Sequence, residues 1–147
     1  MIDLKQIHEM WSRDSEIRMQ LDECSRETPM LHAKYLEFLS TTKLQLKRAE
    51  FTQKVLLKEK WLYYNGKMSQ EDVVAKGWDP DPFDGLKILK GEMEYYYDAD
   101  PEIQKSEEKI QYFKTVIDTL EQIISNLNWR HQTIGNIIKW KQFESGN

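Results

Sequence analysis

A seven-residue repeat of apolar side chains, between residues 103 and 127, constrains the fold of this chain more than any other feature. Seven of its eight a and d positions are apolar over about four heptads. The eight positions are Ile103, Ser106, Ile110, Phe113, Ile117, Leu120, Ile124 and Leu127. Ile134 and Ile138 continue the register beyond Asn126–Asn128, where we expect an interruption. The repeat predicts a long helix whose stripe packs either inside the chain or against other copies of it.

Isoleucine-rich heptads favour multi-stranded association. We therefore predict that this stripe makes a homo-oligomer, although an internal core helix is the alternative. The predicted oligomerisation residues are Ile103, Ile110, Phe113, Ile117, Leu120, Ile124, Leu127, Ile134 and Ile138.

A second long helix is predicted from Thr28 to Asn65. Thr28 supplies a capping hydroxyl, Pro29 suits the first helical position, and no glycine or proline occurs between Met30 and Asn65. Asn65-Gly66 is typical of a helix C-terminus. On an ideal helix the apolar residues share an arc about 100° wide. They are Leu31, Tyr35, Phe38, Leu39, Thr42, Leu46, Ala49, Leu56 and Leu57.

The remaining segments complete a mainly α-helical prediction. Residues 3–19 suit a short amphipathic helix, residues 66–85 are rich in glycine and proline and predict a connector, and residues 86–98 favour helix over strand. Asp100-Pro101-Glu102 predicts the start of the heptad helix. We expect residues 1–90 to form a binding region that includes the connector, and residues 91–147 to form an oligomerisation region.

Charge is distributed unevenly along the chain. The net charge is −4, yet residues 43–67 carry seven basic and two acidic side chains, while residues 68–108 carry four basic and twelve acidic ones. On the predicted helix, Lys43, Lys47, Lys54 and Lys58 fall within about 60° of one another, across from most of the apolar arc. This basic block could simply be a solvated helix face.

Two features favour a nucleic-acid-binding role for the basic block. Few acidic residues lie near it, and it ends in the segment 58–64, where cations alternate with aromatics. Lysines can follow a phosphate backbone while aromatic rings stack on bases of any sequence, which suits single strands. The candidate DNA-binding residues are Lys43, Lys47, Arg48, Lys54, Lys58, Lys60, Trp61, Tyr63, Tyr64 and Lys67. For the three aromatic residues, packing in the core is an equal alternative.

No motif indicates an enzyme, a cofactor or a metal site. The three histidines are scattered and Cys24 has no histidine near it, and no phosphate-binding, nucleophile-elbow or dinucleotide pattern occurs. Asp79, Asp81 and Asp84 imitate a calcium loop, but Lys90 stands where its closing glutamate belongs. A single cysteine, no apolar signal core and no apolar run of about 20 residues predict a soluble intracellular protein.

Three stretches of the chain carry a resemblance to a known family. The first, KYLEFLSTTKLQLKRAEFTQKVLLKEKWLYYNGK, contains Leu57-Lys58-Glu59-Lys60, followed by Tyr63-Tyr64-Asn65-Gly66. The others are the segment GEMEYYYDADPEIQKSEEKIQYFK and the ending Phe143-Glu144-Ser145-Gly146. With these stretches in matching order, the chain resembles the UvsY family of recombination mediators from T4-type phages over roughly residues 20–147, and the first stretch is similar to the basic helix of that family.

The resemblance implies a non-enzymatic, ring-like homo-oligomer of six or seven subunits, assembled through the C-terminal helical region. It implies sequence-independent binding of single-stranded DNA, with the family's LKxR signature carried over to Lys58 and Lys60. The implied partners are a RecA-type phage recombinase and the phage single-strand DNA-binding protein. The protein would load the recombinase in exchange for that binding protein during recombination, repair and replication, in the cytoplasm of the infected bacterial host.

The chain departs from the family pattern at Lys60, where arginine is usual, so that the planar guanidinium is lost. On an ideal helix, Lys58 and Lys60 diverge by about 200°. Lys58 and Lys60 can therefore contact the same DNA strand only if the helix ends there or if neighbouring subunits share the site. The rival interpretation is a helical oligomeric adaptor that binds only proteins.

Overall fold

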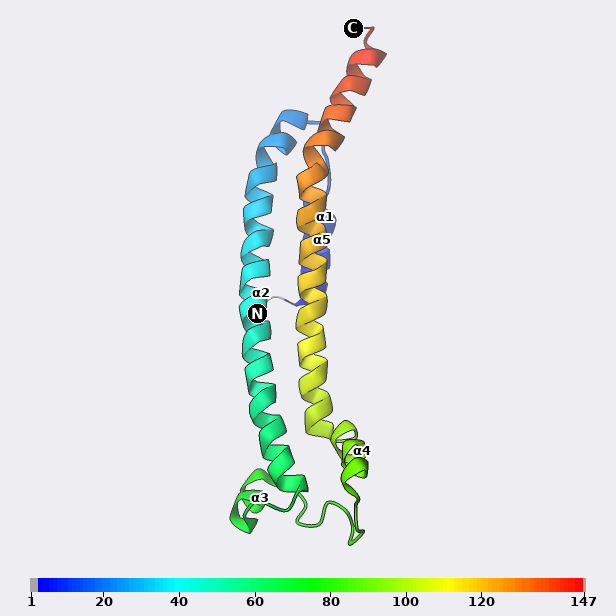
Figure 1. The fold of residues 1–147 in the computed structure, drawn as a ribbon. Helices are drawn as coiled ribbons and strands as arrows, with labels where there is room; N and C mark the ends of the chain where they lie inside the picture. Colours follow the sequence, from blue (N-terminus) through cyan, green and yellow to red (C-terminus); the bar gives the residue numbers. More distant parts are fainter. Residues whose placement is uncertain (1–2, 147) are drawn as a thin grey trace. The chain divides into compact units, whose positions relative to one another are not determined.

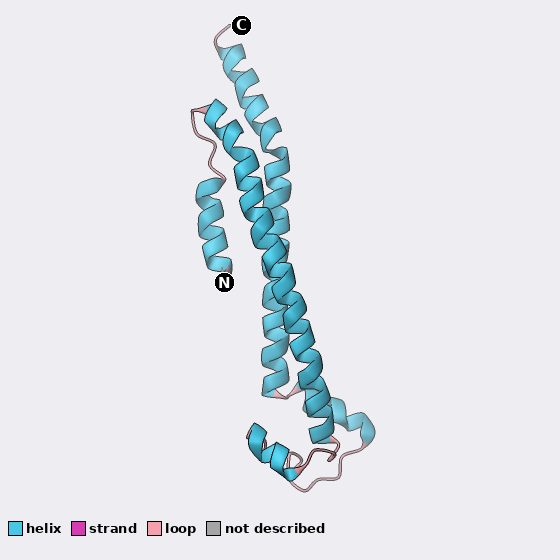
Figure 2. Ribbon diagram, turned by 90° about the vertical axis from the view of Figure 1, so that its left-hand side faces the viewer, coloured by secondary structure: helices cyan, strands magenta, loops and turns pink. Residues whose placement is uncertain are grey.

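The computed structural model describes residues 3–146, which form helices and loops without a strand (Figure 2). The helices, in chain order, are α1 (Leu4–Asp14), α2 (Leu21–Tyr64), α3 (Gln70–Lys76), the 3-10 helix η1 (Lys90–Glu92), α4 (Met93–Asp98) and α5 (Pro101–Glu144). Helices α2 and α5 each contain 44 residues. The mainly α prediction, with a long basic helix and a C-terminal heptad helix, is confirmed.

The chain divides into two compact units. Unit 1 comprises the described residues up to Gln45 together with those from Phe113 onward, and unit 2 comprises Leu46–Tyr112. Both α2 and α5 contribute to each unit (Figure 1). The units therefore do not follow the linear division at residue 90 that the sequence suggested, because each is built from segments of both long helices. A functional division at residue 90 stays a prediction.

In unit 1, α1 is joined to both long helices. Ile7 is completely buried, and the ring of Trp11 meets that of Tyr35 edge-on, with 5.6 Å between centroids. The carboxylate of Asp14, at the end of α1, accepts hydrogen bonds from Lys34 Nζ (2.7 Å) and the Tyr35 hydroxyl (2.8 Å). Buried Arg130 donates to the carbonyl oxygens of Asp14 (2.8 Å) and Glu16 (3.2 Å). A cation from α5 thus satisfies carbonyls at the C-terminal end of α1 and just beyond it.

Helix α2 begins earlier than the sequence predicted. Its first residue is Leu21, so Pro29 lies inside the helix and Thr28 is no N-cap. Proline has no N–H, so the helical bond to the Ser25 carbonyl is missing. The Thr28 hydroxyl donates to the carbonyl of Cys24, one turn earlier in the same helix, at 3.0 Å. The prediction failed because a Thr-Pro pair is an N-terminal signal only when the preceding residues are not helical.

The C-terminus of α2 is where the sequence placed it. The helix ends at Tyr64, and Gly66 adopts the left-handed conformation with φ of 69°. The N–H of Lys67 bonds to the Leu62 carbonyl at 2.8 Å, and that of Gly66 bonds to the Tyr63 carbonyl. These bonds satisfy carbonyls that the helix leaves open, as in a Schellman turn. The predicted connector then contains one unforeseen helix, α3, which Ser69 caps.

Helix α5 starts as predicted and continues further than expected. The Asp100 carboxylate accepts hydrogen bonds from the N–H groups of Glu102 (2.9 Å) and Ile103 (3.2 Å), and Pro101 is the first helical residue. No interruption occurs at Asn126–Asn128, because the helix runs on to Glu144. None of the helices within residues 3–146 combines the length and apolar content needed to cross a membrane.

Candidate nucleic-acid interface

Within unit 2, α2 carries a row of exposed cations on its outward side. Lys47, Lys54 and Lys58 are all exposed, and they lie within about 40° of one another on the helix. The buried positions of α2, such as Ala49 and Lys60, lie on the opposite side. Across residues 3–146, no ion pair involves any of these three lysines. Their positive charge is therefore available to a ligand, and we call these residues, together with Phe51, the cation face.

Phe51 belongs to the cation face because its ring lies between two of the lysines. The ring is 55% exposed, and its centroid is 5.0 Å from Lys47 Nζ and 5.7 Å from Lys54 Nζ. The sequence analysis missed Phe51, although a phenylalanine flanked by lysines and opposite the apolar arc was a readable signal. Trp61, which is 45% exposed, forms a similar pair with Lys67, whose Nζ is 4.6 Å from its ring centroid.

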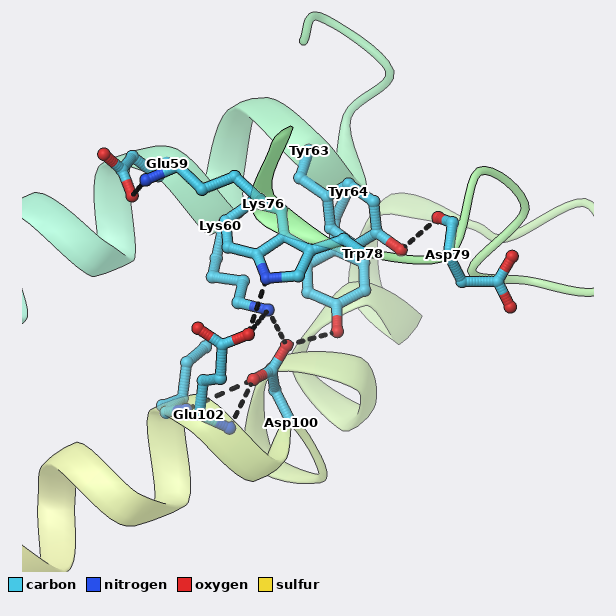
Figure 3. A network of polar contacts seen from close by, with 10 residues as sticks. Glu59, Lys60, Tyr63, Tyr64, Lys76, Trp78, Asp79, Asp100 and Glu102 are labelled. Atoms are coloured by element: carbon cyan, nitrogen blue, oxygen red, sulfur yellow. Dashed lines mark hydrogen bonds and ion pairs between the residues drawn. The ribbon is translucent and has the colours of Figure 1, made fainter. Parts of the chain in front are cut away.

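Lys60 points inward, and only 4% of it is exposed. Its Nζ lies 2.9 Å from Asp100 Oδ2, 3.5 Å from Glu102 Oε1 and 3.8 Å from the ring centroid of Trp78 (Figure 3). Trp78 Nε1 in turn donates to Glu102. We call Lys60, Tyr64, Trp78, Asp100 and Glu102 the Lys60 cluster. The structure gives Lys60 protein partners in place of the expected phosphates, so we carry forward Lys58, and not Lys60, as a phosphate contact.

The register of α2 explains why Lys60 is buried. Lys60 follows Leu39, Leu46 and Gln53 at seven-residue intervals, and this row faces the interior together with the row that contains Tyr35 and Thr42. A lysine in a core row needs a buried partner, because an unpaired buried charge is costly. Asp100 and the face of Trp78 meet that need. The seven-residue spacing from Leu39 would have predicted from the sequence that Lys60 is buried.

Asp100 connects the end of α2 with the start of α5. Besides capping α5, its carboxylate accepts hydrogen bonds from the Tyr64 hydroxyl (2.6 Å) and from Lys60. Burial alone would raise the pKa of Asp100, but the bonds from Tyr64, Lys60 and the Ile103 N–H, with the Lys60 charge, hold that pKa below its usual value. The carboxylate is therefore ionised at neutral pH and balances the Lys60 charge.

Tyr63 and Tyr64 are part of an internal aromatic cluster. Tyr63 is 8% exposed, packs on Trp78 with 5.0 Å between ring centroids, and donates its hydroxyl to the Asp79 carbonyl. Tyr64 contacts the rings of Phe83, Tyr96 and Tyr97. The structure thus places these two tyrosines in the packing of unit 2 and leaves Trp61 on the surface. Stacking on bases by Tyr63 or Tyr64 stays a prediction without support in this arrangement.

The other predicted DNA-binding residues are also on the surface. Arg48 and Lys67 are exposed in unit 2. Lys43 is exposed in unit 1, where its Nζ lies 3.8 Å from Glu121. A groove of about 320 Å³ within unit 2 lies beside Ala49, Thr52 and Leu56 of α2, and Lys105 and Lys109 line it from α5. This groove brings two further cations near the basic half of α2.

Most of the predicted oligomerisation residues are buried within the chain. The buried ones are Ile103, Ile110, Phe113, Leu120, Leu127 and Ile134. Ile117 and Ile124 are half-buried, and Ile138 is 42% exposed. The apolar repeat is therefore largely used by the chain's own core, which was the alternative interpretation of the heptads. A role for these residues between subunits stays a prediction.

The C-terminal part of α5 exposes aromatic residues that the sequence analysis did not select. Trp129, Trp140 and Phe143 are 64%, 62% and 73% exposed. On the helix they fall within about 60° of one another, across from buried Leu127 and Ile134. The rings of Trp140 and Phe143 are stacked, with 5.6 Å between centroids. We call these three residues the aromatic stripe, and an exposed stripe of this kind is typical of a protein interface.

Residues that could hold a metal ion do not gather in the described part of the chain. Within residues 3–146, no group of three or more histidine, cysteine, aspartate or glutamate side chains has a suitable arrangement. Asp81 and Asp79 instead accept hydrogen bonds from the backbone of their own turn. The aspartates of the connector therefore stabilise a turn, as their spacing suggested.

Replacing Lys60 should destabilise the protein, whereas replacing Lys58 should not. Lys60→Ala leaves Asp100 buried without its cation, which costs about 3–5 kcal/mol. Lys58→Ala removes an exposed side chain and should change stability by less than about 0.5 kcal/mol. Urea unfolding followed by circular dichroism measures both variants. Equal stabilities of the two variants would show that the Lys60 cluster contributes nothing to folding.

The stabilising effect of Asp100 should disappear in acid. Because its pKa is lowered in the folded state, Asp100 stabilises the protein above the unfolded-state pKa, near 4, and this contribution is lost as the pH falls through the folded-state pKa. The difference in melting temperature between wild type and Asp100→Asn should therefore be large at pH 7 and shrink toward pH 3. Asp14, whose pKa is also lowered, is present in both proteins, so its effect cancels. If the difference in melting temperature stays constant with pH, ionised Asp100 does not stabilise the fold.

Comparisons with known proteins find a matching family, a related phage protein and similar crystal structures. The family model described as "Recombination, repair and ssDNA binding protein UvsY" matches residues 10–147. The recombination protein uvsY of Enterobacteria phage T4 is 28% identical over 117 residues, which are 80% of this chain and 78% of that protein.

Crystal structures of the bacteriophage T4 recombination mediator protein UvsY share the fold. One crystal form (lattice type II) matches with a TM-score of 0.81 at 24% identity and covers 99% of both chains. Another (lattice type I) matches with a TM-score of 0.77 at 25% identity and covers 93% of this chain and 97% of that chain. Since the family model matches nearly the whole length, this chain belongs to the UvsY family of recombination, repair and single-stranded-DNA-binding proteins.

Proposed function

We propose that this protein is a recombination mediator that binds single-stranded DNA through the cation face of α2. The observation that carries the proposal is the row of exposed, unpaired lysines at Lys47, Lys54 and Lys58, next to the exposed aromatic rings of Phe51 and Trp61. Lysine side chains neutralise the phosphate of any nucleotide, and aromatic rings stack on any base. Such a face binds a strand without reading its sequence.

The Lys60 cluster lies on the side of α2 opposite the cation face and fixes the end of the helix that carries it. Lys58 and Lys60 lie on opposite sides of the last turns of α2, so Lys58 is presented outward while Lys60 fixes the helix end to Asp100. Within unit 2, Arg48 and Lys67 add further exposed positive charge to α2 and to the residues just after it. In this proposal Lys58 contacts phosphate directly, and Lys60 acts through the position of the helix.

The protein's role is to load a RecA-type phage recombinase onto the strand in exchange for the phage single-strand DNA-binding protein. Membership of the UvsY family supports this role in recombination and repair, in the cytoplasm of the infected host. The protein hydrolyses nothing in this scheme. An adaptor that binds only proteins is the rival function, and exposed apolar surface such as the aromatic stripe is the observation that favours it.

Self-association into a ring of six or seven subunits is the second part of the proposal. Each subunit offers a weak, charge-driven site, and several linked sites bind one strand far more tightly than any single site. Because the heptad residues are mostly buried, the aromatic stripe is the better candidate for the contact between copies. Burial of three exposed aromatic rings would strongly favour association.

The salt dependence of DNA binding tests whether the cation face binds single-stranded DNA. A fluorescent single-stranded oligonucleotide should bind tightly at low salt, and each lysine that contacts a phosphate should contribute about 0.7 to the slope of log K against log salt. Lys54→Ala with Lys58→Ala should weaken binding and flatten the slope by roughly 1.4. Lys5→Ala, on an exposed position of α1, is the control and should change neither. Absence of binding by the wild type at low salt would favour the protein-only adaptor.

Sedimentation velocity tests the proposed ring and its subunit contact. Trp140→Glu with Phe143→Glu should convert a large assembly into smaller species, because charges would be placed in the apolar contact. Gln142→Glu adds a charge to the same exposed segment and should leave the assembly intact. A wild type that sediments as a monomer would overturn the ring. An intact assembly in the double variant would exclude the aromatic stripe as the subunit contact.

A further inference from the structure

The ring of Phe51 serves no visible purpose in the packing of unit 2. It lies on the side of α2 opposite buried Ala49 and Lys60, and 55% of it is exposed. An exposed phenylalanine gains little from burial, so its contribution to folding is small. Single exposed apolar residues are common on protein surfaces, and the neighbours of this one make it distinctive.

Two unpaired cations flank the ring. Lys47 Nζ and Lys54 Nζ lie 5.0 Å and 5.7 Å from the ring centroid, and neither takes part in an ion pair among the described residues. An apolar protein segment placed on this ring would remove water from both ammonium groups without offering them a partner, which is unfavourable. A nucleotide offers a flat base to the ring and phosphates to the ammonium groups, so it matches both parts of the site.

We propose that Phe51 is a base-stacking platform, on which one base of a single strand lies while Lys47 and Lys54 hold the phosphates on either side. The inference rests on the proposed binding of single-stranded DNA and adds to it the residue that engages a base. The lysines move from the ring to the phosphates as the base arrives, so that the ring exchanges a cation–π contact for a stacking contact.

Trp61 is in position to be a second platform on the same path. It follows Phe51 by ten residues, which is about 15 Å along the helix axis and about 80° around it. Lys54 and Lys58 lie between the two rings, and Lys67 covers the ring of Trp61 with its Nζ at 4.6 Å. A strand that follows α2 thus meets aromatic and cationic side chains in alternation. The spacing requires that the two rings engage different nucleotides.

The test compares a strand that has bases with one that lacks them. Wild type, Phe51→Ala and Val55→Ala are titrated with a short oligothymidine, and with the same sugar-phosphate strand carrying abasic units. Val55 is the matched control because it is exposed to a similar extent (59%) one turn further along α2. Phe51→Ala should weaken binding of the oligothymidine about tenfold, since stacking on one aromatic residue has an effect of this size. It should leave both the abasic strand and the salt slope unchanged.

Three outcomes would overturn the proposal. An equal loss on both strands would assign Phe51 to general positioning, and no loss on either would remove it from the interface. A change of sedimentation coefficient in Phe51→Ala would make it a subunit contact. In each of these cases the wild type still binds the oligothymidine with a salt slope that depends on Lys58. Failure of the proposed function is distinct, because the wild type would then bind neither strand.

Discussion

The buried ion pair between Lys60 and Asp100 is the interaction on which the arrangement of unit 2 depends. Removing both charges from water is costly, and the cost is offset only because the pair is surrounded by further partners: the Tyr64 hydroxyl, the Trp78 ring and the first N–H groups of α5. These partners come from α2, from Trp78 in the loop that follows α3, and from α5. One small group of atoms therefore joins the last turns of α2 to the first turn of α5 and holds Lys60 toward the interior of unit 2.

Helix ends could be predicted from the sequence wherever a local signal decides them. Asp100-Pro101 starts α5 and Gly66 ends α2, because capping and left-handed glycine depend on a few adjacent residues. The Thr28-Pro29 signal failed because the residues before it, from Leu21, are also helical. Helix α3 was missed because it is only seven residues long and lies between glycines and prolines, whose composition alone predicts a loop.

The exposure of some candidate residues could be predicted from the sequence, and that of others could not. Angles on an ideal helix placed Lys47, Lys54 and Lys58 outward, and the structure agrees. Lys60 was included because the resemblance carried over the LKxR motif as a unit. The angle of about 200° between Lys58 and Lys60 already limited a shared strand to a helix end or a site between subunits, and the structure turns Lys60 toward Asp100. The sequence could not predict whether the isoleucines pack within the chain or between chains, because the same heptads can pack against a helix of either kind.

The twofold role of Asp100 also has a consequence for how the chain folds. A helix cap normally forms with its own helix, from residues a few positions apart. Here the capping carboxylate is held by Lys60 and Tyr64, which are about 40 residues earlier in the sequence. Nucleation of α5 is thereby coupled to completion of α2, which favours one cooperative folding step for unit 2 over the independent formation of two helices.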